Sequence, residues 1–239
     1  MFVPAIILGI IGLVCGMLLR QTYGKVKKIK DTPTTDIRYL DTGMFEVKAT
    51  ISESSDVIES PLSKLECVWF CIHIEEYVKR GKNSSWKTKL KISEQGHCIL
   101  DDGSGECILD LKDIDFEFDK QYSGKSGTLD NPTQEEQAAL NRYGMDGENF
   151  LGFNRKLRYT EYVLRPGDEL YVLGNCEEQQ DSELMRMCSS AEQKLFVSDK
   201  SEDALISKYN VQLAWQGLLT LGFLGGAAAI SILSLLELF

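Results

Sequence analysis

Two histidines and seven cysteines are the side chains of this sequence best suited to metal or nucleophilic chemistry. Cys67 and Cys71 lie four residues apart in an aromatic, β-branched segment, so on a strand they would share a face. Their separation of roughly 13 Å would be too long for two ligands of one tetrahedral zinc ion. The sequence has no Cys-x2-Cys pair, and His73 and His97 are its only histidines. These spacings predict no metal site.

Nucleophilic catalysis has little support either. Cys98 follows His97 directly, and adjacent residues of a strand point to opposite faces. Cys107 could approach a histidine across a hairpin, but a buried core thiol is the stronger interpretation. The segment Asp101-Asp102-Gly103-Ser104-Gly105 lacks the Lys and following helix of a phosphate loop and the ligand ladder of a calcium loop. We expect it to be a tight turn, and we expect no catalytic, cofactor-binding or metal residues. A hydrolase using Cys98 or Cys107 is the weakest alternative.

The cysteine count leaves the redox state open. The six cysteines outside the first apolar segment form an even number, so disulfides are arithmetically possible. Their scattered spacing favours buried thiols in a reducing compartment. These residues are Cys67, Cys71, Cys98, Cys107, Cys176 and Cys188.

Charge is strongly segregated along the 239 residues. Nearly all of it lies between Arg20 and Lys208, and the net charge is −10. An acidic domain lacks the cationic surface that replaces phosphate counterions, so we expect no nonspecific binding of nucleic acid. The length allows one domain of fair size or two small ones.

Two apolar segments at the ends of the sequence predict membrane spans. Phe2–Leu19 carries no charged side chain and is just long enough to cross a hydrocarbon core of about 30 Å as a helix. A signal peptide would need a basic start and a small-residue cleavage site, so a retained anchor is favoured. The second segment covers residues 211–236. We expect it to continue a helix that begins near Asp199, with Glu202 completing a capping box.

Small residues recur at helical spacing in both spans. Gly9, Gly12 and Gly16 line one side of the first, and Gly222 and Gly226 mark the second. Small residues let helix backbones approach closely in lipid, so the spans are expected to pack against each other or against another copy. The alternative is that Gly is simply common in membrane helices.

Basic residues flank only the inner ends of the two spans. The positive-inside rule then places the central domain in the cytoplasm and both termini outside, as a two-pass integral membrane protein. The cluster after the first span is also expected to contact anionic lipid headgroups. It consists of Arg20, Lys25, Lys27, Lys28 and Lys30.

Alternating and β-branched segments dominate the part between the spans. Strands are expected at residues 44–51, 67–78, 86–92, 98–100, 106–109, 115–119, 159–164, 169–173 and 194–198, with loops at 80–85 and 121–132. One helix is expected at Thr133–Tyr143, capped by Thr133 and ended by Gly144. The fold class is therefore mostly β (α+β), a compact β-barrel or sandwich-like domain of seven to nine strands with one inserted helix.

The expected organisation has five parts. Residues 1–19 form a transmembrane helix, 20–36 a basic juxtamembrane linker, and 37–198 the soluble β-rich domain. Residues 199–210 form a juxtamembrane helix that leads into the second transmembrane helix at 211–239.

Several segments together resemble a known family. They are TGMFEVKAT at 42–50, SPLS at 60–63, CVWF at 67–70, LDDGSG at 100–105, YTEYVLRPGDELYVLG at 159–174 and SDKSE at 198–202. In order and spacing, the stretch from Asp36 to Asn210 is similar to the GIDE (MULAN-type) family, which consists of mitochondrial, membrane-anchored RING E3 ubiquitin ligases. The resemblance implies the "beside a membrane" domain of that family, which lies between two spans.

The resemblance does not extend to the catalytic module. In those ligases a RING follows the second span, whereas this sequence ends at Phe239, three residues after Leu236. We therefore expect a RING-less prokaryotic relative, with no family catalytic residues to carry over. In the mitochondrial relatives this domain faces the intermembrane space, in contrast to the cytoplasmic placement predicted from charge.

Two functions follow as expectations. The first is a membrane-anchored, non-enzymatic binding or scaffold module that recognises an unidentified protein partner or a lipid close to the bilayer, without a cofactor. The second is a component of a ubiquitin-like protein transfer system, supplying substrate recognition to a separate catalytic chain.

Overall fold

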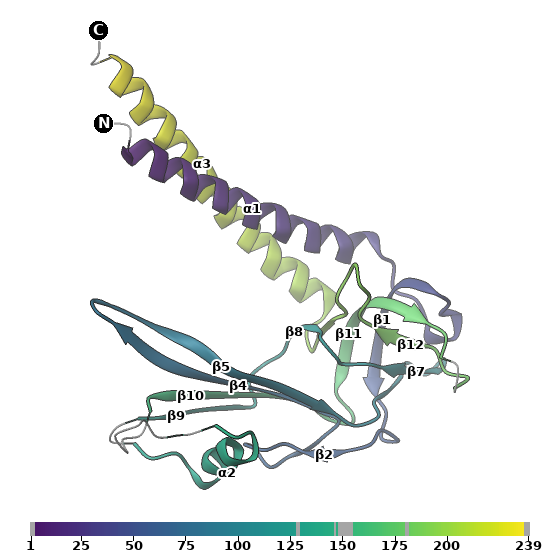
Figure 1. Cartoon of the computed structure of the whole chain (residues 1–239). Helices are drawn as coiled ribbons and strands as arrows, with labels where there is room; N and C mark the ends of the chain where they lie inside the picture. Colours follow the sequence, from purple (N-terminus) through teal and green to yellow (C-terminus); the bar gives the residue numbers. More distant parts are fainter. Residues whose placement is uncertain (1–2, 128–129, 146, 148–154, 180–181, 237–239) are drawn as a thin grey trace. The chain divides into compact units, whose positions relative to one another are not determined.

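The computed structural model describes residues 3–127, 130–145, 147, 155–179 and 182–236. The chain divides into two compact units (Figure 1). One unit combines the two ends of the chain, Met1–Pro33 and Lys200–Phe239, and the other is Thr34–Asp199. We describe each unit by itself.

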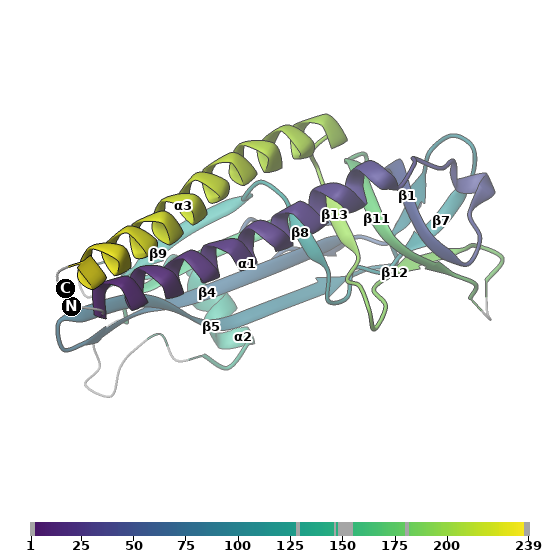
Figure 2. The same ribbon diagram turned by 90° about the horizontal axis from the view of Figure 1, so that it is seen from above.

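The first unit is a pair of long helices, α1 (Val3–Asp31) and α3 (Glu202–Leu236). They lie side by side and antiparallel in both ribbon views (Figures 1 and 2). Their most apolar windows have mean hydropathies of 2.2 and 2.0, and each helix is long and apolar enough to cross a membrane. At 1.5 Å per residue, both are longer than a hydrocarbon core of about 30 Å. The two helices fit a two-pass membrane protein.

The polar ends of both helices differ from the sequence expectation in detail. The basic segment expected as a linker is helical as far as Asp31, and Pro33 follows the helix end. The second helix begins at Glu202, where Ser201 Oγ accepts a hydrogen bond from Ala204 N at 3.4 Å. Ser201, and not the expected Asp199, therefore occupies the position directly before the helix. Asp199 accepts a hydrogen bond from Asp119 N at 3.2 Å within the other unit.

Three of the five highlighted glycines face the partner helix. A Cβ on Gly12 would lie 2.7 Å from a side-chain carbon of Leu224, and one on Gly16 would lie 3.7 Å from Thr220. A Cβ on Gly226 would lie 3.7 Å from Leu8. By contrast, a Cβ on Gly9 or Gly222 would meet nothing within 4 Å. The predicted packing of the spans against each other is present at the first three positions.

Gly12 should therefore tolerate a side chain poorly. We expect Gly12→Leu to weaken pairing of α1 with α3 by about 1–3 kcal/mol, because overpacking forces the helices apart. Pairing can be followed as disulfide formation between cysteines introduced at Thr22 and Gln212, whose side-chain polar atoms lie 3.5 Å apart. Gly9→Leu is the matched control, since that position is open. Equal loss of cross-linking in both variants would contradict the observed packing.

The second unit contains a closed five-stranded barrel. Its strands are β1 (Gly43–Ile51), β6 (Ile99–Asp101), β7 (Glu106–Leu109), β12 (Arg186–Cys188) and β11 (Glu169–Glu177). The ring closes because β11 pairs with β12 on one side and with β1 on the other. The short strands β13 (Phe196–Ser198) and β8 (Asp115–Glu117) extend this sheet from β11. The expected mostly β fold is confirmed.

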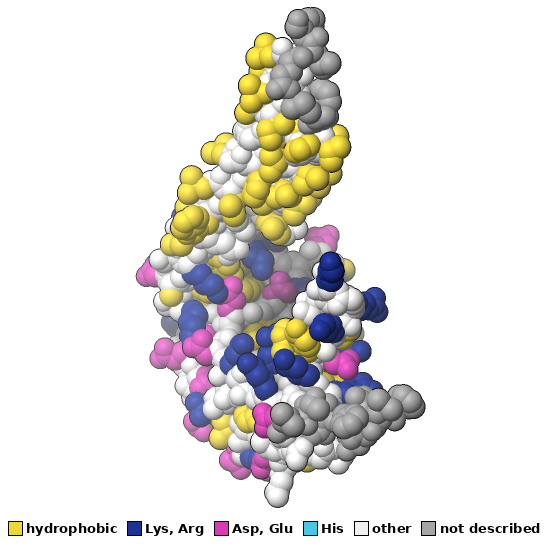
Figure 3. Space-filling model, turned by 90° about the vertical axis from the view of Figure 1, so that its left-hand side faces the viewer, with side chains coloured by type: hydrophobic (Ala, Val, Ile, Leu, Met, Phe, Trp, Pro, Cys, Tyr) yellow, Lys and Arg dark blue, Asp and Glu magenta, His cyan; other side chains and the backbone are white. Residues whose placement is uncertain are grey.

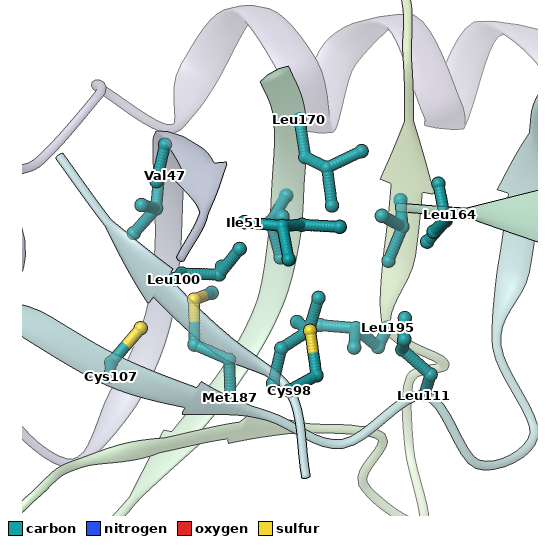
Figure 4. Close-up of a cluster of buried hydrophobic side chains, with 14 of the residues drawn as sticks. Val47, Ile51, Cys98, Leu100, Cys107, Leu111, Leu164, Leu170, Met187 and Leu195 are labelled. Atoms are coloured by element: carbon teal, nitrogen blue, oxygen red, sulfur yellow. The ribbon is translucent and has the colours of Figure 1, made fainter. Parts of the chain in front are cut away.

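Alternate residues of these strands fill the barrel. Val47, Ala49 and Ile51 of β1 are buried, as period-two alternation requires. They pack with Leu100 and Met187, which are fully buried (Figure 4). The close packing makes the barrel interior a hydrophobic core.

A four-stranded sheet forms the other half of this unit. Its order is β5 (Asn83–Gln95), β4 (Trp69–Arg80), β10 (Leu157–Leu164) and β9 (Tyr122–Ser126). One face packs against α2 (Gln134–Arg142) through a second core that includes Phe70, Ile72, Ile74, Tyr159 and Leu140. Thr133 and Glu136 form a capping box at the start of α2, so the predicted helix is confirmed.

Several strand boundaries differ from the prediction. The described residues form thirteen strands, because β9, β12 and the small pair β2 (Ile58–Glu59) and β3 (Glu66–Cys67) were not expected. The predicted loop at 121–132 contains β9, and its residues 128–129 lie outside the described part of the chain. The predicted hairpin loop at 80–85 is only the turn Gly81-Lys82, where Gly81 has φ +59°. A break at Val68 ends β3 and begins β4 at Trp69.

That break separates the two cysteines that an unbroken strand would place on one face. Cys67 is buried in the core beneath α2, and Cys71 is buried in the barrel core. One extra residue outside the alternation is sufficient to reverse which side the following residues face.

Candidate functional site

The thiols of the second unit are buried and protonated at neutral pH. Desolvation raises the pKa of both Cys98 and Cys107 to about 12. Burial likewise raises the pKa of Cys67 to about 12, of Cys71 and Cys176 to about 11, and also that of Cys188. Because the thiolate is the nucleophile, these values argue against the hydrolase alternative. The first span's Cys15 lies outside this group.

Thiol labelling provides a direct check. We expect the six cysteines of the folded domain to react with a soluble maleimide at least about tenfold more slowly than in denaturant, because burial and a raised pKa both suppress attack. The measurement is labelling followed by mass spectrometry of the full chain in detergent, with Cys15→Ser removing the half-exposed thiol of α1. A domain cysteine that reacts faster when folded would revive the nucleophile hypothesis.

Two buried carboxylates, missed by sequence reasoning, have structural partners. Glu161 on β10 is fully buried and accepts hydrogen bonds from Leu62 N at 2.9 Å, Ser63 N at 2.8 Å and Ser63 Oγ at 2.5 Å. It thereby fixes the turn after Ser60-Pro61 onto the four-stranded sheet. The signal in the sequence was its place between Tyr159 and Val163, inward-facing positions of the same strand.

Glu46 on β1 plays a comparable role at the start of the domain. It is fully buried and accepts hydrogen bonds from Tyr171 Oη at 2.5 Å and Thr34 Oγ1 at 2.6 Å. Thr35 N also donates to the main-chain oxygen of Glu46 at 2.8 Å. The beginning of the second unit is therefore held to the barrel from its first residues.

The Asp-rich turn is a structural turn, as predicted. Asp102 accepts hydrogen bonds from Ser104 N at 2.8 Å and from Ile37 N, at the start of the short helix η1 (Ile37–Tyr39), at 2.7 Å. Desolvation opposes ionisation of Asp102, but hydrogen bonds from Ser104, Ile37 and Gly105 outweigh it and hold the pKa below its usual value. This carboxylate serves the fold by joining η1 to the turn.

This lowered pKa predicts a pH dependence. A folded-state pKa below the unfolded value stabilises the fold above the unfolded pKa, near 3.8, and the stabilisation disappears as the pH falls through the lower folded value. We expect Asp102→Asn to cost about 1 kcal/mol at pH 7. The difference from wild type should vanish in strong acid, as measured by urea unfolding at several pH values. A pH-independent difference would show that ionisation of Asp102 plays no part.

The most distinctive surface of the second unit is the hairpin of β4 and β5. From Tyr77 to Lys91 it carries six cations and no carboxylate, in a chain of net charge −10. We call residues 77–91 the cationic hairpin. Its basic side chains are exposed and its end projects beyond β9 and β10 (Figure 1). The cations are Lys79, Arg80, Lys82, Lys87, Lys89 and Lys91.

Aromatic rings are interleaved with these cations. Tyr77 and Trp86 are paired across the hairpin, with ring centroids 5.4 Å apart. Lys156 Nζ lies 4.5 Å from the centroid of Tyr77, and the guanidinium of Arg158 lies 4.7 Å from that of Trp86. These cation–π contacts order the rings and keep positive charge around them. Figure 3 shows Lys and Arg side chains gathered around a hydrophobic patch on this side of the domain.

Only part of this charge is neutralised locally. Arg158 donates to Glu75 at 2.7 Å, and Lys89 pairs with Glu76 at 3.0 Å. With Arg155, Lys156 and Arg158 included, the region holds nine cations against these two carboxylates. The cationic hairpin and these neighbouring residues together therefore form a surface region of net charge +7 on an acidic protein.

The same face of the sheet continues toward the barrel as an aromatic cluster. His73 and Tyr162 have ring centroids 5.6 Å apart, and Phe116 lies 5.1 Å from Tyr162. Lys91 Nζ lies 5.9 Å from the centroid of Phe116. Burial and the neighbouring Lys91 lower the pKa of His73, so its imidazole is neutral at pH 7. The cluster packs β4, β10 and β8 against one another.

The basic residues expected from the sequence to contact lipid lie in the other unit, on α1, and all five are exposed. They are Arg20, Lys25, Lys27, Lys28 and Lys30. Sequence reasoning missed the cationic hairpin because residues 80–85 were considered only as a loop and residues 86–92 only as an alternating strand. The signal was available, since fifteen residues without one carboxylate are unusual in so acidic a chain.

The described residues contain no group of three or more His, Cys, Asp or Glu side chains that could hold a metal ion. No curated protein and no solved structure matches the chain. A family model described as GIDE, E3 ubiquitin ligase, matches residues 72–230. The match runs from β4 into α3 and covers well over half of the sequence. The chain therefore belongs to the GIDE family.

Proposed function

We propose that this protein is a membrane-anchored, non-enzymatic binding module, related to the domain of GIDE-type E3 ubiquitin ligases. The observation that carries the proposal is the cationic hairpin, an exposed patch of charge opposite in sign to the rest of the chain. Such a patch attracts an oppositely charged partner and orients its approach.

The candidate chemical groups support a binding role more than a catalytic one. The thiols are buried with raised pKa values, and Glu46 and Glu161 are occupied by hydrogen bonds that hold chain segments in place. Catalytic groups instead need access to a reacting atom. The exposed surface offers charge and aromatic rings, which suit recognition.

Photo-cross-linking tests the binding role. A benzoylphenylalanine at Ser84, in the cationic hairpin, should form a discrete adduct with a protein or a lipid in native membranes. The control position is Ser190, which is exposed outside the hairpin. The adduct should disappear when Lys82 and Lys87 are changed to Glu. Failure to form an adduct with either class of partner, or equal adducts from both positions, would overturn the proposal.

The family match favours a second candidate, a component of a ubiquitin-like transfer system that supplies substrate recognition to a separate catalytic chain. The two candidates differ in a reconstituted reaction with an activating enzyme, a conjugating enzyme and ubiquitin. We expect the full chain in nanodiscs to produce no ubiquitin transfer and no binding of the charged conjugating enzyme. Chain-dependent transfer would contradict the non-enzymatic proposal, and binding without transfer would favour the second candidate.

The proposed orientation has the domain in the cytoplasm and both termini outside, since the basic residues flank the inner ends of the spans. Because the native thiols of the domain are buried, the test uses Ser84→Cys together with Cys15→Ser in intact cells. An impermeant maleimide should label the introduced thiol only after lysis. Labelling of intact cells would reverse the orientation.

Two further contacts belong to this proposal. Arg20, Lys25, Lys27, Lys28 and Lys30 would meet lipid headgroups beside the first span. A Cβ on Gly9 or Gly222 would meet nothing within 4 Å, so these two glycines would be the positions for association with a second copy.

A further inference from the structure

We propose that the cationic hairpin binds anionic phospholipid headgroups of the same membrane that holds α1 and α3. This inference rests on the proposed binding function and names the ligand of its binding face. The shared chemistry is the phosphate and carboxylate groups at the surface of an anionic leaflet.

Charge is the first argument. The hairpin's cations are spread along both strands and the turn, and Lys89 has a carboxylate partner within the sheet, Glu76 at 3.0 Å. Lys79, Lys82 and Lys87 are exposed, and none of the ion pairs among the described residues involves them. Lys79 and Lys87 lie on opposite faces of the hairpin and Lys82 lies in its turn, so positive charge surrounds the hairpin end. Cations placed in this way complement a negatively charged surface, where each contributes to attraction within a Debye length.

The side chains at the hairpin end are polar, which suits contact with headgroups and not insertion into the bilayer. The turn Arg80-Gly81-Lys82-Asn83 contains no apolar side chain, so it has nothing to insert into the hydrocarbon. Tyr77 and Trp86 are half-buried and lie behind the turn, each with a cation over its ring. Rings with an apolar body and a polar edge suit the headgroup level. The pattern therefore fits a surface contact.

The connectors are the third argument, and they favour a lipid over an acidic protein. Only Thr32-Pro33 separates α1 from the second unit, and only Lys200-Ser201 separates that unit from α3. Two extended residues span at most about 7 Å. Residues 20–31 of α1 add about 18 Å of helix after the predicted span, so the domain is tethered within about 25 Å of the hydrocarbon core. At that range headgroups are present at a high effective concentration without any diffusional encounter.

The experiment measures the proximity of Trp86 to lipid headgroups in the full chain. The chain with Trp215→Phe is reconstituted into vesicles of phosphatidylcholine alone, or with about a third of phosphatidylserine, each containing a nitroxide-headgroup lipid as quencher. Trp69 is buried in the core and supplies a constant background. We expect stronger quenching in the anionic vesicles, and loss of the difference at high salt because exposed charges are screened.

Charge variants make the result specific. Changing Lys79, Lys82 and Lys87 to Gln should weaken docking of the hairpin about a hundredfold, since each cation near an anionic surface contributes about fivefold. The matched control changes Lys64, Lys112 and Lys120 to Gln, which removes the same charge from exposed positions outside the hairpin. Near-UV circular dichroism confirms that both variants remain folded.

The possible outcomes separate the two proposals. Equal quenching in the two lipid mixtures, or the same loss in both triple variants, overturns the lipid assignment. If the Ser84 position nevertheless cross-links to a protein in native membranes, the binding function stands and its ligand is an acidic protein. If it cross-links to neither class, the binding function itself fails.

Discussion

Replacing Glu161 with Ala is expected to lower the free energy of unfolding of the domain by about 3 kcal/mol. The carboxylate is fully buried and accepts three hydrogen bonds, two of them from the main-chain N–H groups of Leu62 and Ser63. Each such hydrogen bond contributes about 1.5–3 kcal/mol. The net loss is smaller than their sum, because the Ala variant no longer bears the cost of burying the carboxylate. The turn after Ser60 should then detach from β10.

Thermal unfolding of the full chain in detergent measures this effect. A loss of about 3 kcal/mol corresponds to a fall in Tm of roughly 6–12 °C for a chain of this size. Glu161→Gln should recover only part of the loss, because its NH2 group would face a donor. Glu59→Ala is the matched control, since its side chain is 64% exposed and should cost less than about 0.5 kcal/mol. Equal effects at both positions would refute the role assigned to Glu161.

Trp69→Ala is expected to be at least as destabilising, at about 3–5 kcal/mol. Trp69 is 1% exposed, and its ring packs edge-on against Phe116 and Phe118, with centroids 5.3 and 5.6 Å away. Truncating a large buried aromatic leaves a cavity between the first residue of β4 and the barrel, and the lost contacts are not replaced. Urea unfolding followed by near-UV circular dichroism should show the lower midpoint.

The conservative substitution at Trp69 makes this prediction specific. The indole N–H is buried and has no hydrogen-bond partner among the described residues. Trp69→Phe therefore loses volume without losing a hydrogen bond, and we expect less than half the cost of the Ala variant. A Phe variant as unstable as the Ala variant would show that the N–H group has a partner on which the fold depends.

Local sequence was sufficient for the elements with strong patterns. Alternation at 44–51 and 86–92 and the Thr133 cap of α2 predicted β1, β5 and the helix, because these signals depend on near neighbours. The polar strand β9 could not be found in this way, since it is held mainly by backbone pairing with β10. Closure of the barrel joins β1 to β11 across more than a hundred residues, and no local pattern encodes that pairing.

The candidate site was less predictable than the fold. The sequence located a basic cluster near the first span and predicted the hairpin itself, but the contact of Trp86 with Tyr77 and of both rings with cations from β10 and the residues before it depends on pairing across the sheet. Glu46 illustrates the same limit. Its hydrogen-bond partners Thr34 and Tyr171 lie 12 and 125 residues away in the sequence, so composition alone would place it in solvent.

The ends of the second unit have a topological consequence. Thr34 forms a β-bridge with Glu46 of β1, and Glu46 pairs with Leu173 of β11. On the other side of β11, Leu173 pairs with Phe196 of β13. Thr34, the first residue of the domain, and Phe196, three residues before its last, are therefore about three strand spacings apart, or about 15 Å. In these terms the protein is a helical hairpin whose loop has been replaced by a folded insertion. Since loop-closure entropy grows only as the logarithm of length, unfolding of the insertion should leave the helix pair intact. Another compact domain with similarly spaced ends should be able to take its place.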